Sequence, residues 1–259
     1  MRFHGLLDDD FSISLGPNQT SYINLDSLID FTQSIGVAPL FEVSFMPSWL
    51  AANASQTIMH YRGITSPPSN YTQWGLLVED MARHLLERYG PEAVSSWLFE
   101  IWNEPNGGFW TGNPKQQTYF QLYKEAADAF RRVSPLFRVG GPAMAGCPGW
   151  ISDLRTFANS TNTTLSFVSC HTYGGGDQPD NVGSIHDFAG ALPSTRKAAG
   201  NLPVVITEWS RFFFFLVVCF WLVCGVGGGG GGGREEGEED RECRSKTKEE
   251  KGELKQKGE

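Results

Sequence analysis

The sequence has little positive charge and few cysteines for its length. Its 259 residues carry 21 Lys and Arg against 29 Asp and Glu, which gives a formal net charge of -8 at pH 7. Nucleic-acid binders need a basic face for phosphates, and anionic membrane surfaces attract basic segments, so both partners are disfavoured. The 5 scattered cysteines provide neither a disulfide framework nor a CxxC metal motif. This composition is typical of a soluble enzyme or binding domain.

The N-terminus lacks a signal peptide. MRFHGLLDDD has no basic region, no apolar stretch and no small-residue cleavage site. N-x-S/T sequons nevertheless occur in polar, loop-like stretches, at Asn18, Asn53, Asn70, Asn159 and Asn162. They arise either by chance or because the full-length parent is a lysosomal or extracellular glycoprotein whose leader is missing from this chain.

The composition changes abruptly after residue 210. Residues 212–224 are uninterrupted hydrophobics, 227–233 are all glycine, and 234–259 are mostly charged residues and glycine. The apolar run would span only ~20 Å as a helix, short of the ~20 residues that a bilayer crossing needs. A membrane anchor or a buried strand remains an alternative for it. We interpret 211–259 as a disordered, low-complexity tail that is not native to the fold, for example translated non-coding or frame-shifted sequence.

Strands and helices alternate through residues 1–208. Apolar runs predict strands at 1–7, 37–45, 94–102, 137–140, 165–171 and 203–208. Helical spacing of apolar residues predicts helices at 25–35, 70–89, 116–133, 150–158 and 184–199. About six β/α units indicate an α/β fold with a parallel sheet. Because no Gly-rich phosphate turn follows the first strand, a barrel is favoured over a doubly wound sheet.

Two carboxylates follow strands at the end where barrel enzymes carry their active sites. Glu104 lies in WLFEIWNEPN (97–106), and Glu208 lies in LPVVITEWS (202–210). Cleavage of a glycosidic bond needs two opposed carboxyl groups, one to protonate the leaving oxygen and one to attack the anomeric carbon or activate water. This pair is therefore a candidate for glycoside hydrolysis.

The chain resembles glycoside hydrolase family 39, which includes β-xylosidases and α-L-iduronidases. The resemblance covers nearly all of 1–210, through RFHGLLDDD, FEVSFMP, FEIWNEPN, RVGGPAM, FVSCHTY and VVITEWS in that order. It implies a retaining mechanism on a (β/α)8 TIM barrel, with Glu104 as acid/base and Glu208 as nucleophile. It also implies that Asn103 contacts the 2-hydroxyl and that other side chains surround the sugar, namely His4, His171 and Tyr173.

Aromatic and acidic residues elsewhere are less specific. Trp49, Trp110 and Trp209 could stack on sugar rings, although about half of such a set is normally core. Asp8–Asp10 lack the spacing of an EF-hand, so we interpret them as a solvated loop or a helix entry. We expect no metal and no cofactor.

The pattern corresponds to about strands 2–7 of an eight-stranded barrel. We therefore expect 1–210 to be a partial catalytic domain, without the first and eighth strands. A parallel barrel closes only when all its strands pair. We expect this chain alone to fold poorly and its activity to be compromised.

Several functions remain open. The leading one is a retaining β-xylosidase-like hydrolase. An α-L-iduronide would want cationic partners for its carboxylate, and Arg62 and Lys115 lie in suitable loops. A truncated inactive or carbohydrate-binding relative is a further alternative, as is a protein tethered to a membrane through 212–224.

Overall fold

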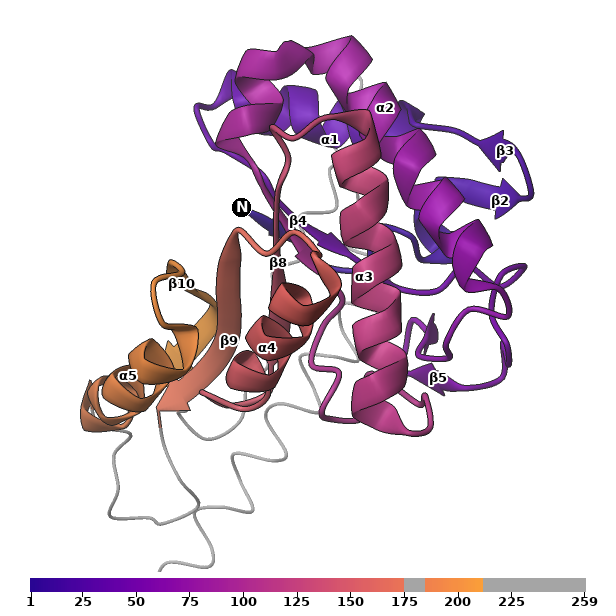
Figure 1. Ribbon diagram of the computed structural model, residues 1–259. Helices are drawn as coiled ribbons and strands as arrows, with labels where there is room; N and C mark the ends of the chain where they lie inside the picture. The colour runs from indigo at the N-terminus through magenta and orange to yellow at the C-terminus, as the bar shows by residue number, and fades with distance from the viewer. Residues whose placement is uncertain (175–184, 212–259) are drawn as a thin grey trace, which may run out of the picture. The chain divides into compact units, whose positions relative to one another are not determined.

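A six-stranded parallel sheet forms the centre of the fold (Figure 1). The computed structural model describes residues 1–174 and 185–211, and our predictions for 212–259 fall outside these residues. The sheet contains, in spatial order, β1 (Arg2–Phe3), β4 (Leu40–Val43), β7 (Leu98–Ile101), β8 (Arg138–Met144), β9 (Phe167–Gly174) and β10 (Val204–Arg211). Neighbouring strands pair in parallel throughout.

Helices connect successive strands of this sheet. They are α1 (Ile23–Ser34), α2 (Tyr71–Ser96), α3 (Lys115–Val133), α4 (Ile151–Thr161) and α5 (Ile185–Ala199). Neighbouring helices pack against one another: α2 against α3, α3 against α4, and α4 against α5 (Figure 1). Smaller elements decorate the loops: a 3₁₀ helix η1 (Asp9–Phe11), the hairpin of β2 (Ser14–Gly16) with β3 (Gln19–Thr20), and the hairpin of β5 (Thr57–Ile58) with β6 (Gly63–Ile64).

The helices form where apolar residues recur at helical spacing. In α2 the buried stripe contains Trp74, Leu77, Met81 and Leu85, and α3 buries Tyr119, Tyr123, Ala126 and Phe130. Asn70 begins α2, because its side-chain oxygen accepts a hydrogen bond from the Gln73 amide at 3.1 Å. These stripes pack on the apolar strands and form one large core, which confirms the helical pattern read from the sequence.

Several predicted strand boundaries are wrong: the strands expected at 1–7 and 37–45 are shorter, at Arg2–Phe3 and Leu40–Val43, and those expected at 137–140, 165–171 and 203–208 extend to Met144, Gly174 and Arg211. The strand expected at 94–102 begins only at Leu98, because the preceding residues are helical up to Ser96. Gly90 does interrupt α2, with φ 79° and ψ 167°, as the Gly90-Pro91 pair predicts. Pro91 then starts a further helical turn, since its fixed φ suits the first turn of a helix. The signal that ends one helix therefore also begins another.

The described strands make an open part of a (β/α)8 barrel. β1 pairs with β4 and β10 pairs with β9, so that these two strands are the edges of the six-stranded sheet among the described residues. This confirms the α/β fold and the incomplete barrel predicted from the sequence. Within the described residues, no helix is both long and apolar enough to cross a membrane.

Candidate active site

Glu104 and Glu208 both lie at the carboxyl edge of the sheet, as predicted from their positions after strands. Glu104 follows β7 in a loop whose backbone is held by the Glu104 amide donating to the Ala143 carbonyl at 2.9 Å. Its φ of 40° lies in the left-handed region, which is sparsely populated for residues other than glycine. Glu208 lies within β10, directly after a register shift between Ile206 and Glu208. Such irregularities re-aim side chains beside active sites.

His171 brings the two carboxylates into one group. Its Nδ1 atom lies 2.8 Å from Glu104 Oε1 and 3.6 Å from Glu208 Oε2. One donor or acceptor atom from each of the three residues falls within 4.8 Å of the others. The His171 side chain is fully buried, whereas those of Glu104 and Glu208 are 19% and 28% exposed. The two carboxylates are thus partly exposed to solvent, whereas the imidazole that they contact is buried. Because Nδ1 faces two carboxylate oxygens, we assign it as the ring nitrogen that donates.

Glu208 is held by both of its oxygens. Arg2 Nη1 donates to Oε1, and the Tyr173 hydroxyl donates to Oε2. Burial raises the pKa of Tyr173 above its usual range, and the Glu208 carboxylate adds to this effect. The phenol therefore stays protonated and remains a donor. Both contacts fix the orientation of the Glu208 carboxyl group.

Arg2 lies at the centre of a buried charge network. Its guanidinium contacts Glu42 Oε2 at 3.1 Å and Glu100 Oε2 at 2.6 Å, in addition to Glu208. Burial alone would lower the pKa of Arg2, but the three carboxylates outweigh it and raise the pKa above its ordinary value. Burial alone would also raise the pKa of Glu42, but Arg2 and His4 lower it to about 2.

The sequence analysis missed this network. Its signal is a carboxylate at the same place in two otherwise apolar strands, LFEV (40–43) and LFEI (98–101). Glu42 and Glu100 are register partners, and both are fully buried. A fully buried carboxylate is rare unless it is paired. Two buried carboxylates in register on neighbouring strands thus indicate a cation close to both.

The remaining sugar-site candidates lie around this network. Asn103 is 2% exposed, and its Oδ1 accepts from Arg2 Nη2 at 2.8 Å, which leaves the amide nitrogen as a donor. His4 Nδ1 lies 2.5 Å from Glu42 Oε2, and its Nε2 lies 3.0 Å from the Tyr61 hydroxyl. Burial would lower the pKa of His4, but Glu42 outweighs burial and raises it.

The three tryptophans divide between surface and core. Trp209 follows Glu208 and is 74% exposed, whereas Trp110 is buried, with its indole N–H donating to Lys115 O and Thr118 Oγ1. Trp49 is half-buried and lines a separate cavity. The structure therefore assigns Trp110 to the core and Trp209 to the surface of β10.

Other sequence candidates lie outside the carboxylate group. Asp8 caps η1 by accepting from the Asp10 amide at 3.1 Å, which confirms the helix-entry interpretation. Lys115 Nζ donates to the Gly107 carbonyl at 2.7 Å, and Arg62 is exposed in the turn between β5 and β6. Lys115, one of the two cations considered for binding a carboxylated sugar, is thus already occupied by a backbone carbonyl.

A disulfide joins Cys147, in the loop after β8, to Cys170 of β9. The sequence analysis did not identify this pair, whose partners lie 23 residues apart. Cys170 directly precedes His171, and Ala145, two residues before Cys147, exchanges two hydrogen bonds with the Asn106 side chain, both of 2.9 Å. The loops that carry Glu104 and His171 are therefore tied together.

Glu104, His171 and Glu208 could in principle hold a divalent cation, because nitrogen and carboxylate oxygens suit such an ion. Glu208, however, already accepts from Arg2 and Tyr173. This arrangement compensates the carboxylate charge with groups of the chain itself.

Paired carboxylates at the carboxyl edge of a parallel barrel are the arrangement of glycoside hydrolases. The sequence agrees, since residues 1–210 match the model of the family named 'Glycosyl hydrolases family 39'. The chain belongs to this family.

Its relatives include a β-xylosidase from Caldicellulosiruptor saccharolyticus, 39% identical over 226 residues that cover 82% of this chain and 46% of the relative. An α-L-iduronidase from Mus musculus is 28% identical over 68% of this chain and 28% of its own length. The crystal structure of a monomeric β-xylosidase from Caulobacter crescentus CB15 superposes with a TM-score of 0.72 at 32% identity, over 82% of this chain and 46% of that one. The chain thus spans less than half the length of these relatives.

Proposed function

We propose that residues 1–210 are part of the catalytic domain of a retaining, β-xylosidase-like glycoside hydrolase. The observation that carries this proposal is the approach of Glu104 and Glu208 to His171, with one atom of each residue within 4.8 Å of the others. In retaining enzymes the two carboxyl groups lie ~5–5.5 Å apart, whereas inverting enzymes need ~6.5–9.5 Å to admit a water. The short separation supports retention.

The mechanism assigns one role to each carboxylate. Glu208 attacks the anomeric carbon and forms a glycosyl ester, while Glu104 donates its proton to the departing glycosidic oxygen. Glu104, now ionised, takes a proton from water, and that water attacks the same carbon and releases Glu208. Two displacements at one carbon restore its configuration.

The surrounding side chains hold these groups for that chemistry. Arg2 and Tyr173 donate to opposite oxygens of Glu208, which orients the carboxylate. His171 donates to Glu104 from a fully buried ring. We propose that Asn103 and His4, which contact Arg2 and Glu42, bind sugar hydroxyls, and that Trp209 stacks on a sugar ring.

A β-xyloside is the substrate we favour. The β-xylosidases of Caldicellulosiruptor saccharolyticus and Geobacillus stearothermophilus are 39% and 38% identical to the chain, against 28% for the α-L-iduronidase of Mus musculus. An α-L-iduronide remains the alternative. It would need a cation for its carboxylate, and Lys115 is engaged with Gly107.

The test uses the purified chain and aryl glycosides of both sugars. Because we expect the 259-residue chain alone to have compromised activity, we expect any hydrolysis that it retains to be of the β-xyloside, with the first product formed in the β configuration by NMR. Glu104→Gln should lose about 10²–10⁴-fold in kcat on a poor leaving group, and much less on a dinitrophenyl leaving group that needs no proton. Glu208→Gln should lose activity on both. Glu87→Gln, an exposed carboxylate of α2, is the matched control.

Labelling with a mechanism-based fluoro-sugar, which traps the glycosyl ester, distinguishes an active enzyme from a relative that only binds carbohydrate. Peptide mapping should find the label on Glu208. Sugar binding without any label would contradict the hydrolase proposal. Faster turnover of the α-L-iduronide would replace the proposed substrate. Full turnover by the isolated chain would contradict our expectation that it folds poorly.

We propose further that the protein follows the secretory route. The five sequon asparagines are all exposed, namely Asn18, Asn53, Asn70, Asn159 and Asn162. The disulfide between Cys147 and Cys170 is of the kind that persists in oxidising compartments. Glycan on the protein isolated from its source would support this route. Free thiols at both cysteines, together with unmodified sequons, would contradict it.

A further inference from the structure

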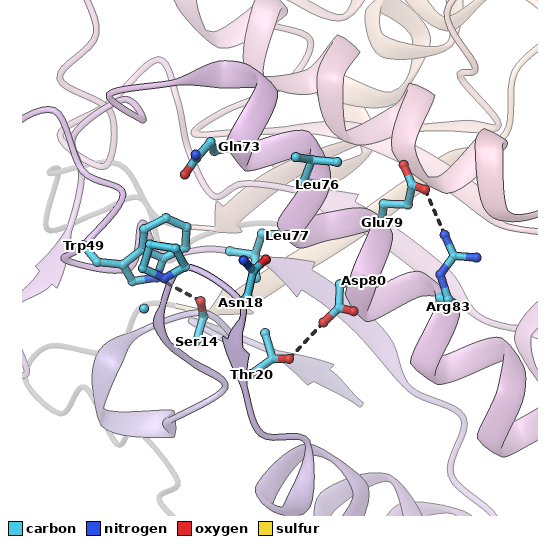
Figure 2. Close-up of a pocket in the computed structure, with 12 residues that line it drawn as sticks. Ser14, Asn18, Thr20, Trp49, Gln73, Leu76, Leu77, Glu79, Asp80 and Arg83 are labelled. Atoms are coloured by element: carbon cyan, nitrogen blue, oxygen red, sulfur yellow. Dashed lines mark hydrogen bonds and ion pairs between the residues drawn. The ribbon is translucent and has the colours of Figure 1, made fainter.

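A cavity of about 490 Å³ lies between the β2–β3 hairpin and the first half of α2 (Figure 2). Trp49, from the loop after β4, forms one of its walls. The cavity is large enough for one or two sugar rings, since ligand pockets typically measure ~300–1,000 Å³. Neither Glu104 nor Glu208 lines it, so it is separate from the proposed active site.

The walls combine a fixed aromatic ring with polar groups. The Trp49 indole N–H donates to Ser14 Oγ at 2.9 Å, which holds the ring in place (Figure 2). Leu76 of α2 adds apolar surface and is 57% exposed. Gln73 and Asp80 point toward the same space from α2 (Figure 2). An aromatic face with convergent hydrogen-bonding groups suits a neutral sugar.

Asp80 also fixes the hairpin. Its Oδ2 accepts from the Thr20 hydroxyl at 2.9 Å and from the Tyr22 hydroxyl at 2.8 Å. Thr20 is the third residue of the sequon Asn18-Gln19-Thr20. The sequon is therefore held against α2 by its own threonine.

Asn18 is itself part of the cavity wall. It lies in the turn between β2 and β3, after Pro17, with φ 56°, a conformation that asparagine tolerates in turns. Its side chain is exposed. A sugar attached there would begin inside the cavity, so it would reach Trp49 as an intramolecular ligand at high effective concentration.

We propose that Asn18 carries an N-linked glycan whose first N-acetylglucosamine rings lie in this cavity against Trp49. The proposal depends on the secretory route proposed above. The modification transfers a preassembled oligosaccharide from a polyprenyl diphosphate donor. A bond forms between Asn18 Nδ2 and the anomeric carbon, the bond from that carbon to the diphosphate oxygen breaks, and the amide loses one proton to solvent. The seated glycan covers Leu76 and joins the hairpin to α2.

The experiment measures glycan release site by site. The chain is produced in a eukaryotic secretory host behind a cleavable leader and treated, while folded, with peptide N-glycosidase. Peptide mapping then follows the conversion of each sequon asparagine to aspartate. We expect release at Asn18 to be about tenfold slower than at the other glycosylated sequons, which corresponds to a contact of about 1.4 kcal/mol. After denaturation, release should be equal at all sites.

Two variants test the role of the ring. Trp49→Ala should abolish the protection at Asn18, whereas Trp49→Phe, which keeps an aromatic face without the hydrogen bond to Ser14, should retain most of it. Cooperative unfolding of both variants, measured by circular dichroism, serves as the control for folding.

The outcomes separate this inference from the proposed route. If all five sequons are unmodified, the secretory proposal fails and this inference fails with it. If other sequons carry glycan but Asn18 does not, or if Asn18 is released as fast as the others, only this inference is overturned. Protection that survives Trp49→Ala also overturns it.

Discussion

Replacing Arg2 with methionine keeps a side chain of similar length in the barrel interior and removes a cation that contacts three carboxylates. Glu42 and Glu100 are fully buried, so both would lose the charge of Arg2 without gaining water, while Glu42 would keep its contact with His4. Breaking a buried ion pair by removing one partner costs about 3–5 kcal/mol. The pKa of Glu42 agrees with this direction, because Arg2 together with His4 lowers it from 4.5 to about 2 despite full burial. We expect Arg2→Met to lower the free energy of unfolding by about 3–5 kcal/mol near pH 7.

The cost should depend on pH in a defined direction. In the parent chain the pKa of Glu42 is lower in the folded state than in the unfolded state. Its stabilisation is therefore present above about pH 4.5 and is lost as the pH falls toward about 2. In the variant, the pKa of Glu42 should be higher than in the parent, because burial then opposes ionisation and only His4 and Ser44 offset it. A neutral carboxyl needs no counter-charge, so the cost should shrink at mildly acidic pH.

Urea titrations followed by tryptophan fluorescence measure this cost at about pH 7 and about pH 4.5. Arg138→Met, an exposed arginine on β8, is the matched control and should be nearly neutral. Arg2→Met combined with Glu42→Gln should recover part of the loss. Equal losses for the Arg2 and Arg138 variants, or a loss of the same size at both pH values, would refute the account of the buried network.

Three further measurements check other contacts. Thr207→Val removes the 2.8 Å hydrogen bond to the buried Glu100 Oε1 and should cost about 1–3 kcal/mol in urea unfolding; a variant as stable as the parent would contradict this. Exchanging Cys147 and Cys170 for serine opens a disulfide that spans 23 residues and should cost roughly 3 kcal/mol; a reducing agent should destabilise the parent alike and leave the variant unchanged. His4→Asn should destabilise the chain more near about pH 5.5 than near about pH 9, because the raised pKa of His4 gives stability below its unfolded value that is lost as the pH rises; a cost that is independent of pH would exclude the ion pair with Glu42.

Local sequence predicts the elements and the places of the two carboxylates. Helix α3 could be predicted because Tyr119, Tyr123, Ala126 and Phe130 recur at helical spacing and are buried. Glu104 and Glu208 could be placed at one edge because parallel strands bring their carboxyl ends together. These inferences depend only on periodicity and chain direction, which the sequence of each element contains.

The contacts among strands could not be predicted in the same way. Arg2 is close in sequence to none of its carboxylate partners, which lie on β4, β7 and β10. The register shift before Glu208 turns Thr207 toward Glu100, and a shift of one residue exchanges the faces of a strand. The disulfide likewise depends on how the β8 loop meets β9. Such facts follow from register, which no single segment determines.

The two carboxylates differ in what holds them. Glu104 has a backbone conformation of the kind that costs about 1–3 kcal/mol, and it is held by Ala143, by His171 and by the loop that Asn106 and the disulfide secure. All of these contacts lie within β7, β8 and β9 and their loops, which are interior strands of the sheet. Glu208 lies on β10, which pairs with β9 at an edge of the described sheet. Tyr173 of β9 holds one of its oxygens, but the other is held by Arg2, which reaches it from β1 at the opposite edge. The geometry of the acid/base candidate should therefore tolerate an open sheet, whereas half of the support of the nucleophile candidate requires the two edges to stay in register with each other.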